Sequence, residues 1–109
     1  MICLVVSDDL MFTQLISNAL PPGGSIRPSG NVDALEKQLD DSVETIVVDL
    51  STSTDPNRFS ELASRASTRL IGVASHVHVA RIRSAKEAGF DFVLTRSQVA
   101  EQLPQILEQ

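Results

Sequence analysis

Short apolar runs alternate with amphipathic helical patterns along the whole chain, and this alternation most constrains its fold. Four apolar runs cover residues 2–6, 45–50, 70–74 and 90–94, and the segment at 25–28 is a fifth, short candidate strand. The segments that follow these runs space their apolar residues for one face of a helix. Continuous apolar runs are typical of strands buried on both faces, and repeated strand–helix alternation builds parallel sheets. We therefore expect an α/β fold with helices on both faces of a parallel sheet.

Boundary signals are clearest for the first predicted helix. Asp8 or Asp9 can cap its start, because a carboxylate accepts hydrogen bonds from the first free backbone N–H groups. The Pro-Pro-Gly-Gly segment at 21–24 ends it. Four apolar residues at helical spacing are predicted to face the core: Met11, Leu15, Ile16 and Leu20.

Two prolines limit where their segments can lie. Pro28 donates no hydrogen bond, so the run at 25–28 is expected at the edge of the sheet. Pro104 lies within the last predicted helix, residues 97–109, and a proline removes one helical hydrogen bond. We expect that helix to start late or to kink.

Composition excludes several classes of protein. The 109 residues fit one domain, residues 1–109, and the net charge of −5 disfavours binding to a phosphate backbone. No apolar run approaches the length of a membrane span, and the N-terminus lacks a cationic signal region. The single cysteine, Cys3, forms no internal disulfide and is expected to be a buried thiol. These features predict a cytoplasmic protein without nucleic-acid or membrane partners.

Polar residues follow the predicted strands at their carboxyl ends. In an open parallel sheet, ligands bind beyond these ends. Asp8 and Asp9 follow the first strand, Asp49 ends the third, and Arg96 follows the fifth. Three carboxylates this close need a cation. The sequence leaves open whether Mg²⁺ or Arg96 itself supplies it.

The chain resembles the receiver domains of bacterial response regulators over nearly its whole length. The resemblance rests on three segments: residues 4–9 (LVVSDD), 46–49 (IVVD) and 88–96 (AGFDFVLTR). It implies a flavodoxin-like, three-layer α/β/α fold with strand order 2-1-3-4-5 and five helices. It also implies that Asp49 accepts a phosphoryl group from a histidine kinase, with Mg²⁺ held nearby.

Three positions depart from the receiver pattern. Ser7 stands where the family has an acidic residue, Ala74 where it has Ser or Thr, and Arg96 where it has Lys. The loss of an acidic residue at Ser7 leaves a weak Mg²⁺ site at Asp8, Asp9 and Asp49, and Ala74 lacks the hydroxyl that contacts the phosphoryl group in the family. Arg96 is expected either to clamp a phosphoryl group on Asp49 or to pair with that carboxylate permanently.

The predicted interaction surface lies on the fourth helix and the fifth strand, the usual partner surface of the family. Its residues are Arg81, Arg83, Lys86 and Phe92. The partner is expected to be a histidine kinase or a downstream signalling protein, and the chain itself a monomer or a weak homodimer.

These observations favour a stand-alone pseudo-receiver that acts through protein–protein interaction, possesses no metal or cofactor of its own beyond weak Mg²⁺, and is not an enzyme. One alternative is a functional single-domain response regulator, with phosphorylation and dephosphorylation at Asp49 as its only chemistry. A second is a flavodoxin-like small-molecule binder, for which the loop at 51–54 (STST) is the one candidate phosphate loop. Fold alone does not decide among them.

Overall fold

Five parallel strands form one sheet in the order β2-β1-β3-β4-β5 in the computed structural model, whose described residues are 1–52 and 55–108. The strands are β1 (Ile2–Val6), β2 (Ser25–Ser29), β3 (Val43–Asp49), β4 (Arg69–Ala74) and β5 (Phe92–Thr95). The helices are α1 (Leu10–Ala19), α2 (Val32–Gln38), α3 (Pro56–Ala66), α4 (Val79–Ala88) and α5 (Val99–Leu107), with a 3₁₀ turn η1 (Arg96–Gln98) before α5. The predicted fold class and strand order are confirmed.

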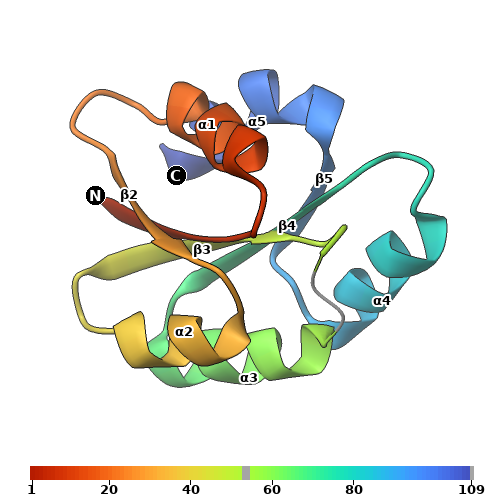
Figure 1. Ribbon diagram of the computed structural model, residues 1–109, viewed down its shortest axis with the longest axis horizontal. Helices are drawn as coiled ribbons and strands as arrows, with labels where there is room; N and C mark the ends of the chain where they lie inside the picture. Colours follow the sequence, from red (N-terminus) through yellow and green to blue (C-terminus); the bar gives the residue numbers. More distant parts are fainter. Residues whose placement is uncertain (53–54, 109) are drawn as a thin grey trace.

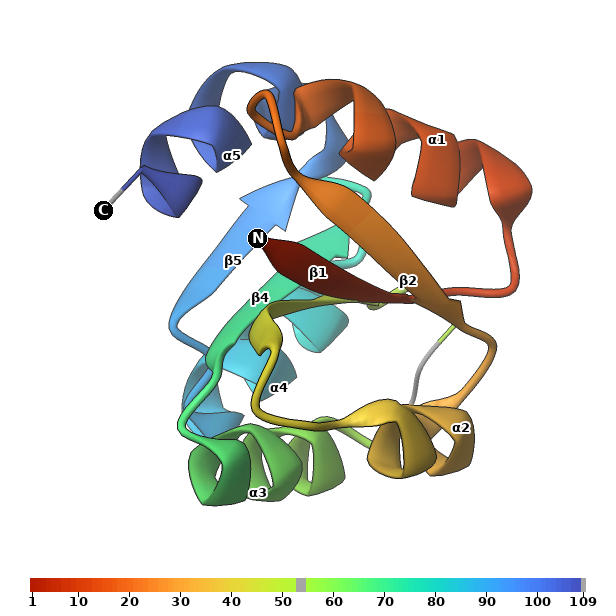
Figure 2. The same ribbon diagram turned by 90° about the vertical axis from the view of Figure 1, so that its left-hand side faces the viewer.

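The helices lie in two layers, one on each face of the sheet. Figures 1 and 2 show α1 and α5 on one face and α2, α3 and α4 on the other. Successive side chains of a strand point to opposite faces. Leu4 and Val6 of β1 accordingly join the core under α2, α3 and α4, whereas Cys3 and Val5 join the core under α1 and α5. The continuous apolar runs therefore fill two cores at once.

Helix α1 begins one residue after Asp9, whose carboxylate accepts a hydrogen bond from the Met11 N–H at 2.9 Å. Its buried residues are Phe12, Ile16 and Ala19. The expectation that Met11 faces the core is wrong, because its side chain is 81% exposed. Phe12, the next residue along the helix, faces the core instead.

The two prolines occupy the places their chemistry permits. Pro28 lies on β2, an edge strand, as predicted. Pro104 lies inside α5, whose regular part starts late, after the 3₁₀ turn. The fifth strand is shorter than predicted and begins at Phe92. Asp91 is excluded from it, and its carboxylate instead accepts a hydrogen bond from the Leu70 N–H at 2.8 Å.

The parallel register brings the carboxyl ends of the central strands to one edge of the sheet. Val6 of β1 pairs with Val48 of β3, and Asp49 pairs with Val73 of β4. Thr95 of β5 pairs with Ala74. The residues that follow β1, β3 and β5 therefore lie close together. None of the described helices is long and apolar enough to cross a membrane.

Candidate functional site

Asp49 is the buried centre of the carboxyl edge. It ends β3, and its side chain is fully buried. The Ser7 hydroxyl donates to Asp49 Oδ2 at 2.8 Å, and the Ser51 N–H donates to Oδ1 at 3.0 Å. Buried carboxylates are stable only when their oxygens accept hydrogen bonds or meet a cation. Both oxygens of Asp49 are engaged by groups of the chain itself.

Ser7 is held in place by its own partner. Its side chain is buried at the end of β1, and its Oγ accepts a hydrogen bond from the Asp9 N–H at 3.0 Å. The Ser7 hydroxyl proton is therefore free to point at Asp49. The same residue orders the turn into α1 and binds the central carboxylate.

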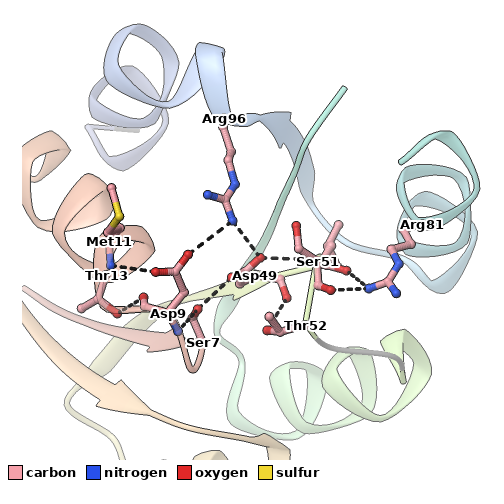
Figure 3. Close-up of polar contacts among 10 residues, drawn as sticks. Ser7, Asp9, Met11, Thr13, Asp49, Ser51, Thr52, Arg81 and Arg96 are labelled. Carbon is pink, nitrogen blue, oxygen red and sulfur yellow. Dashed lines mark hydrogen bonds and ion pairs between the residues drawn. The ribbon is translucent and has the colours of Figure 1, made fainter. Parts of the chain in front are cut away.

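Arg96 supplies a positive charge at this centre. Its Nη2 lies 3.6 Å from Asp49 Oδ1 and 4.0 Å from Asp9 Oδ2, as Figure 3 shows. The guanidinium stands over the Phe12 ring, with Cζ 5.4 Å from the ring centroid. Its side chain is 37% exposed, so water reaches the outer part of the pair. The interaction with Phe12 adds a cation–π contact that holds the guanidinium over the site.

The side chains predicted to hold Mg²⁺ do not gather into one group among the described residues. Mg²⁺ needs oxygen ligands in near-octahedral geometry, and its sites use carboxylates. Asp8 is exposed, and Asp9 caps α1. Residues 1–52 and 55–108 contain no group of three His, Cys, Asp or Glu side chains able to hold a metal. The structure thus brings Asp9 and Asp49 together around Arg96, and leaves Asp8 outside this arrangement.

Ala74 lies at the end of β4 and is fully buried. Its methyl group offers no hydrogen bond to a group attached to Asp49. The phosphate-loop candidate at 51–54 is described only in part, because Ser53 and Thr54 lie outside the described residues. The described half of that loop is tied to Asp49: the Thr52 Oγ1 and N–H both approach the Asp49 carbonyl, at 3.4 and 3.3 Å.

The predicted interaction residues occupy different environments. Arg83 and Lys86 are exposed on α4. Phe92 is partly buried against the core under α1 and α5. Arg81 is exposed, but its Nη1 donates to the carbonyl oxygens of Leu50 and Ser51.

Sequence reasoning missed two of the groups that meet at this site. The Ser51 N–H and the Arg81 contact both involve the backbone just after β3. Backbone groups are present at every residue and leave no pattern in a sequence. Ser7 was noticed only as a departure from the receiver pattern, whereas the structure makes it a hydrogen-bond donor to Asp49.

Solved receiver structures share this fold at low sequence identity. A response regulator from Thermotoga maritima matches with a TM-score of 0.80 and 14% identity, covering 98% of this chain and 93% of that one. NtrX from Brucella abortus matches with a TM-score of 0.79 and 18% identity over 98% of this chain. A response regulator from Burkholderia pseudomallei, solved with a phosphorylated aspartic acid, calcium ion and citrate, matches with a TM-score of 0.71 and 20% identity over 94% of this chain.

The chain spans 25% of the NtrX chain and 63% of the Burkholderia chain. No protein-family model and no curated protein matches its sequence. Identities of this size establish architecture and leave function to be argued from the site. The strand order and the five helices agree with the structural matches. The chain has the fold of the receiver domains of response regulators.

Proposed function

We propose that this chain is an atypical receiver, a pseudo-receiver, which signals by binding another protein and does not depend on Mg²⁺ or on a phosphoryl group at Asp49. The observation that carries this proposal is the state of the Asp49 carboxylate. It is fully buried, both of its oxygens accept hydrogen bonds, and a cation of the chain lies beside it. The negative charge of Asp49 is thus balanced inside the protein.

A carboxylate held in this way is poorly arranged for phosphoryl transfer. Transfer depends on an oxygen aligned with the incoming phosphorus and on cations that neutralise charge on the transferred group. Oδ2 of Asp49 accepts a hydrogen bond from the Ser7 hydroxyl, and Oδ1 accepts one from the Ser51 N–H. Arg96 is already directed at Oδ1. An incoming phosphoryl group would have to displace these contacts, and Ala74 offers no hydroxyl in return.

The binding surface in this proposal is the exposed side of α4. Arg83 and Lys86 are exposed there, and they stand out in a chain with a net charge of −5. Opposite charge across an interface favours encounter and orientation. We infer a signalling partner, a histidine kinase or a downstream protein, that presents acidic groups to α4. The module binds and does not catalyse.

Treatment with acetyl phosphate and Mg²⁺, followed by intact-mass measurement, tests the proposal. We expect the mass to stay unchanged, because the Asp49 oxygens are occupied. The matched control is a receiver that phosphorylates readily, treated in the same tube. A gain of roughly 80 Da, the mass of one phosphoryl group, that disappears in Asp49→Asn would overturn the proposal.

One observation favours the alternative of a phosphorylated regulator. The structural match from Burkholderia pseudomallei carries a phosphorylated aspartic acid and a calcium ion, and Asp49 ends the central strand of this chain. In that case Arg96 would leave Asp49 and bind the phosphoryl oxygens. The mass measurement separates the two functions directly.

A further inference from the structure

Arg81 reaches from α4 to the backbone that follows Asp49. Its Nη1 donates to the Leu50 carbonyl at 2.6 Å and to the Ser51 carbonyl at 2.7 Å (Figure 3). Hydrogen bonds from a charged donor are short and stronger than neutral ones. The start of α4 and the segment after β3 are therefore held together by one guanidinium.

The Leu50 carbonyl belongs to the same peptide group as the Ser51 N–H. That N–H donates to Asp49 Oδ1 at 3.0 Å. A continuous chain of two hydrogen bonds thus runs from the Arg81 guanidinium, through one peptide group, to the Asp49 carboxylate. Donation to the carbonyl polarises the peptide and strengthens its N–H as a donor, because hydrogen bonds in a chain reinforce one another.

We propose that Arg81 is a positioning residue that couples α4 to Asp49 through the Leu50–Ser51 peptide. This inference rests on the proposed function, in which α4 meets an acidic partner. Arg81 is exposed, so a carboxylate of a partner bound to α4 can compete with the Leu50 and Ser51 carbonyls for the Arg81 guanidinium. Such a partner weakens the hydrogen bond from the Ser51 N–H to Asp49. Because coupling between two sites is reciprocal, a change at Asp49 in turn alters the affinity of α4 for that partner.

The coupling has a specific place in this chain. At the end of β4, the buried methyl group of Ala74 provides no polar link between Asp49 and α4. Arg81 bypasses β4 and contacts the loop after β3 directly. The basic residues of α4 therefore divide into one that acts inside the molecule, Arg81, and two that remain on its surface, Arg83 and Lys86.

Hydrogen exchange and the chemical shift of the Ser51 amide test the coupling in the unphosphorylated protein. In Arg81→Ala we expect that amide to exchange about tenfold faster, since the loss of a charge-assisted hydrogen bond loosens its peptide. Arg83→Ala is the matched control, because Arg83 is exposed on the same helix and makes no polar contact with the described residues. Equal Ser51 exchange in both variants would overturn the inference.

Arg81→Met separates hydrogen bonding from packing. Methionine keeps an unbranched apolar stem but has no N–H donor, so we expect the Ser51 amide to exchange as fast as in Arg81→Ala. Protection that returns in Arg81→Met would show that the stem, and not the guanidinium, holds the peptide, and the inference would fail.

The reverse direction is read on the arginine itself. In Asp49→Asn we expect the side-chain N–H signals of Arg81 to shift, whereas those of Arg58, which pairs with Asp33 and Glu36, stay in place. Unchanged Arg81 signals contradict the coupling. None of these experiments uses a phosphodonor or a metal. Failure of the Arg81 coupling is therefore distinguishable from failure of the pseudo-receiver proposal, which the mass measurement tests.

Discussion

The interior of the sheet and its carboxyl edge solve the same problem of burial in different ways. In the interior, fully buried side chains such as Leu4, Val47 and Ile71 need no partner beyond their apolar neighbours. At the carboxyl edge, the equally buried Asp49 is stable because Ser7, Ser51 and Arg96 satisfy it. Burial in the interior depends on apolar packing, whereas burial of Asp49 at the edge depends on its hydrogen-bond and ion-pair partners.

This difference separates the part of the chain that builds the fold from the part that departs from the receiver sequence pattern. The interior carries the apolar pattern that builds the fold. The departures at Ser7, Ala74 and Arg96 all lie at the carboxyl edge. At this edge the Asp49 carboxylate contacts the hydroxyl of Ser7 and the guanidinium of Arg96.

Removing the cation should have the largest effect at the edge. Arg96→Ala leaves the buried Asp49 carboxylate without its charge partner, and we expect a loss of about 3 kcal/mol in the free energy of unfolding, reduced from a fully buried pair by the partial exposure of Arg96. Urea unfolding measures it. Adding Asp49→Asn to Arg96→Ala should recover part of the loss. A double variant less stable than Arg96→Ala would contradict a charge pair.

Filling space in the interior should have the next largest effect. A Cβ at Gly72 would lie 2.8 Å from Leu50 Cδ1 and 3.0 Å from Phe90 Cδ2. We expect Gly72→Ala to cost about 2 kcal/mol, because side chains in a packed core cannot move away freely. Gly30→Ala is the control: nothing lies within 4 Å of its Cβ, so its effect should stay within about 0.5 kcal/mol. Equal thermal unfolding of both variants would show that this part of the interior is loosely packed.

Removing the Ser7 hydroxyl tests the edge with a smaller change. Ser7→Ala leaves Asp49 Oδ2 and the Asp9 N–H without their common partner. We expect a loss of about 1.5 kcal/mol, the usual cost of hydrogen bonds to a charged group. Ser17→Ala on the exposed side of α1 is the control. A Ser7→Ala variant as stable as that control would mean that Ser7 contributes nothing to the burial of Asp49.

The buried thiol tests the interior through pH. Burial raises the pKa of Cys3 from 9.0 to about 12. Between these values the unfolded chain loses the thiol proton while the folded chain keeps it, so stability falls as pH rises. From pH 8 to pH 10 we expect this residue to account for a loss of about 1.4 kcal/mol. Unfolding of the wild type and Cys3→Ala at both pH values isolates it, and parallel pH dependences would contradict the burial of Cys3.

The smallest effect is expected at Asp8. Asp8 is exposed and makes no polar contact with the rest of the described chain, so Asp8→Asn should change stability by less than about 0.5 kcal/mol. We expect the same result with and without millimolar Mg²⁺ in thermal unfolding. If Mg²⁺ stabilised the wild type and Asp8→Asn abolished that effect, the result would support the predicted metal site.

Sequence reasoning predicted the interior better than the edge, for physical reasons. Apolar runs such as residues 2–6 identify strands because burial on both faces demands them. The start of β5 was predicted two residues early because Phe90 extends the apolar residues of the strand, whereas the neighbouring Asp91 carboxylate binds the backbone of β4. Met11 was placed on the wrong face because short helices fix their rotation only by packing.

At the edge, topology predicted that Asp8, Asp9 and Asp49 would meet around Arg96. The structure brings Asp9 and Asp49 to Arg96 and leaves Asp8 exposed. Topology did not predict which groups satisfy Asp49, because a Ser hydroxyl and a backbone N–H have many possible partners. The role of Arg81 was equally out of reach, since its acceptors are carbonyl oxygens. Charge balance is visible in a sequence, whereas hydrogen-bond geometry needs coordinates.

A titration followed by ¹⁵N–¹H correlation spectra, first with Mg²⁺ and then with beryllofluoride, a mimic of the phosphoryl group, tests the central claim most directly. A carboxyl edge closed by Ser7, Ser51 and Arg96 predicts that the amide signals around Asp49 and along α4 stay in place at every step. Shifts that begin at Ser51 and Ala74 and spread into α4 would contradict it, and would show that this receiver fold still binds a cation and a phosphoryl group.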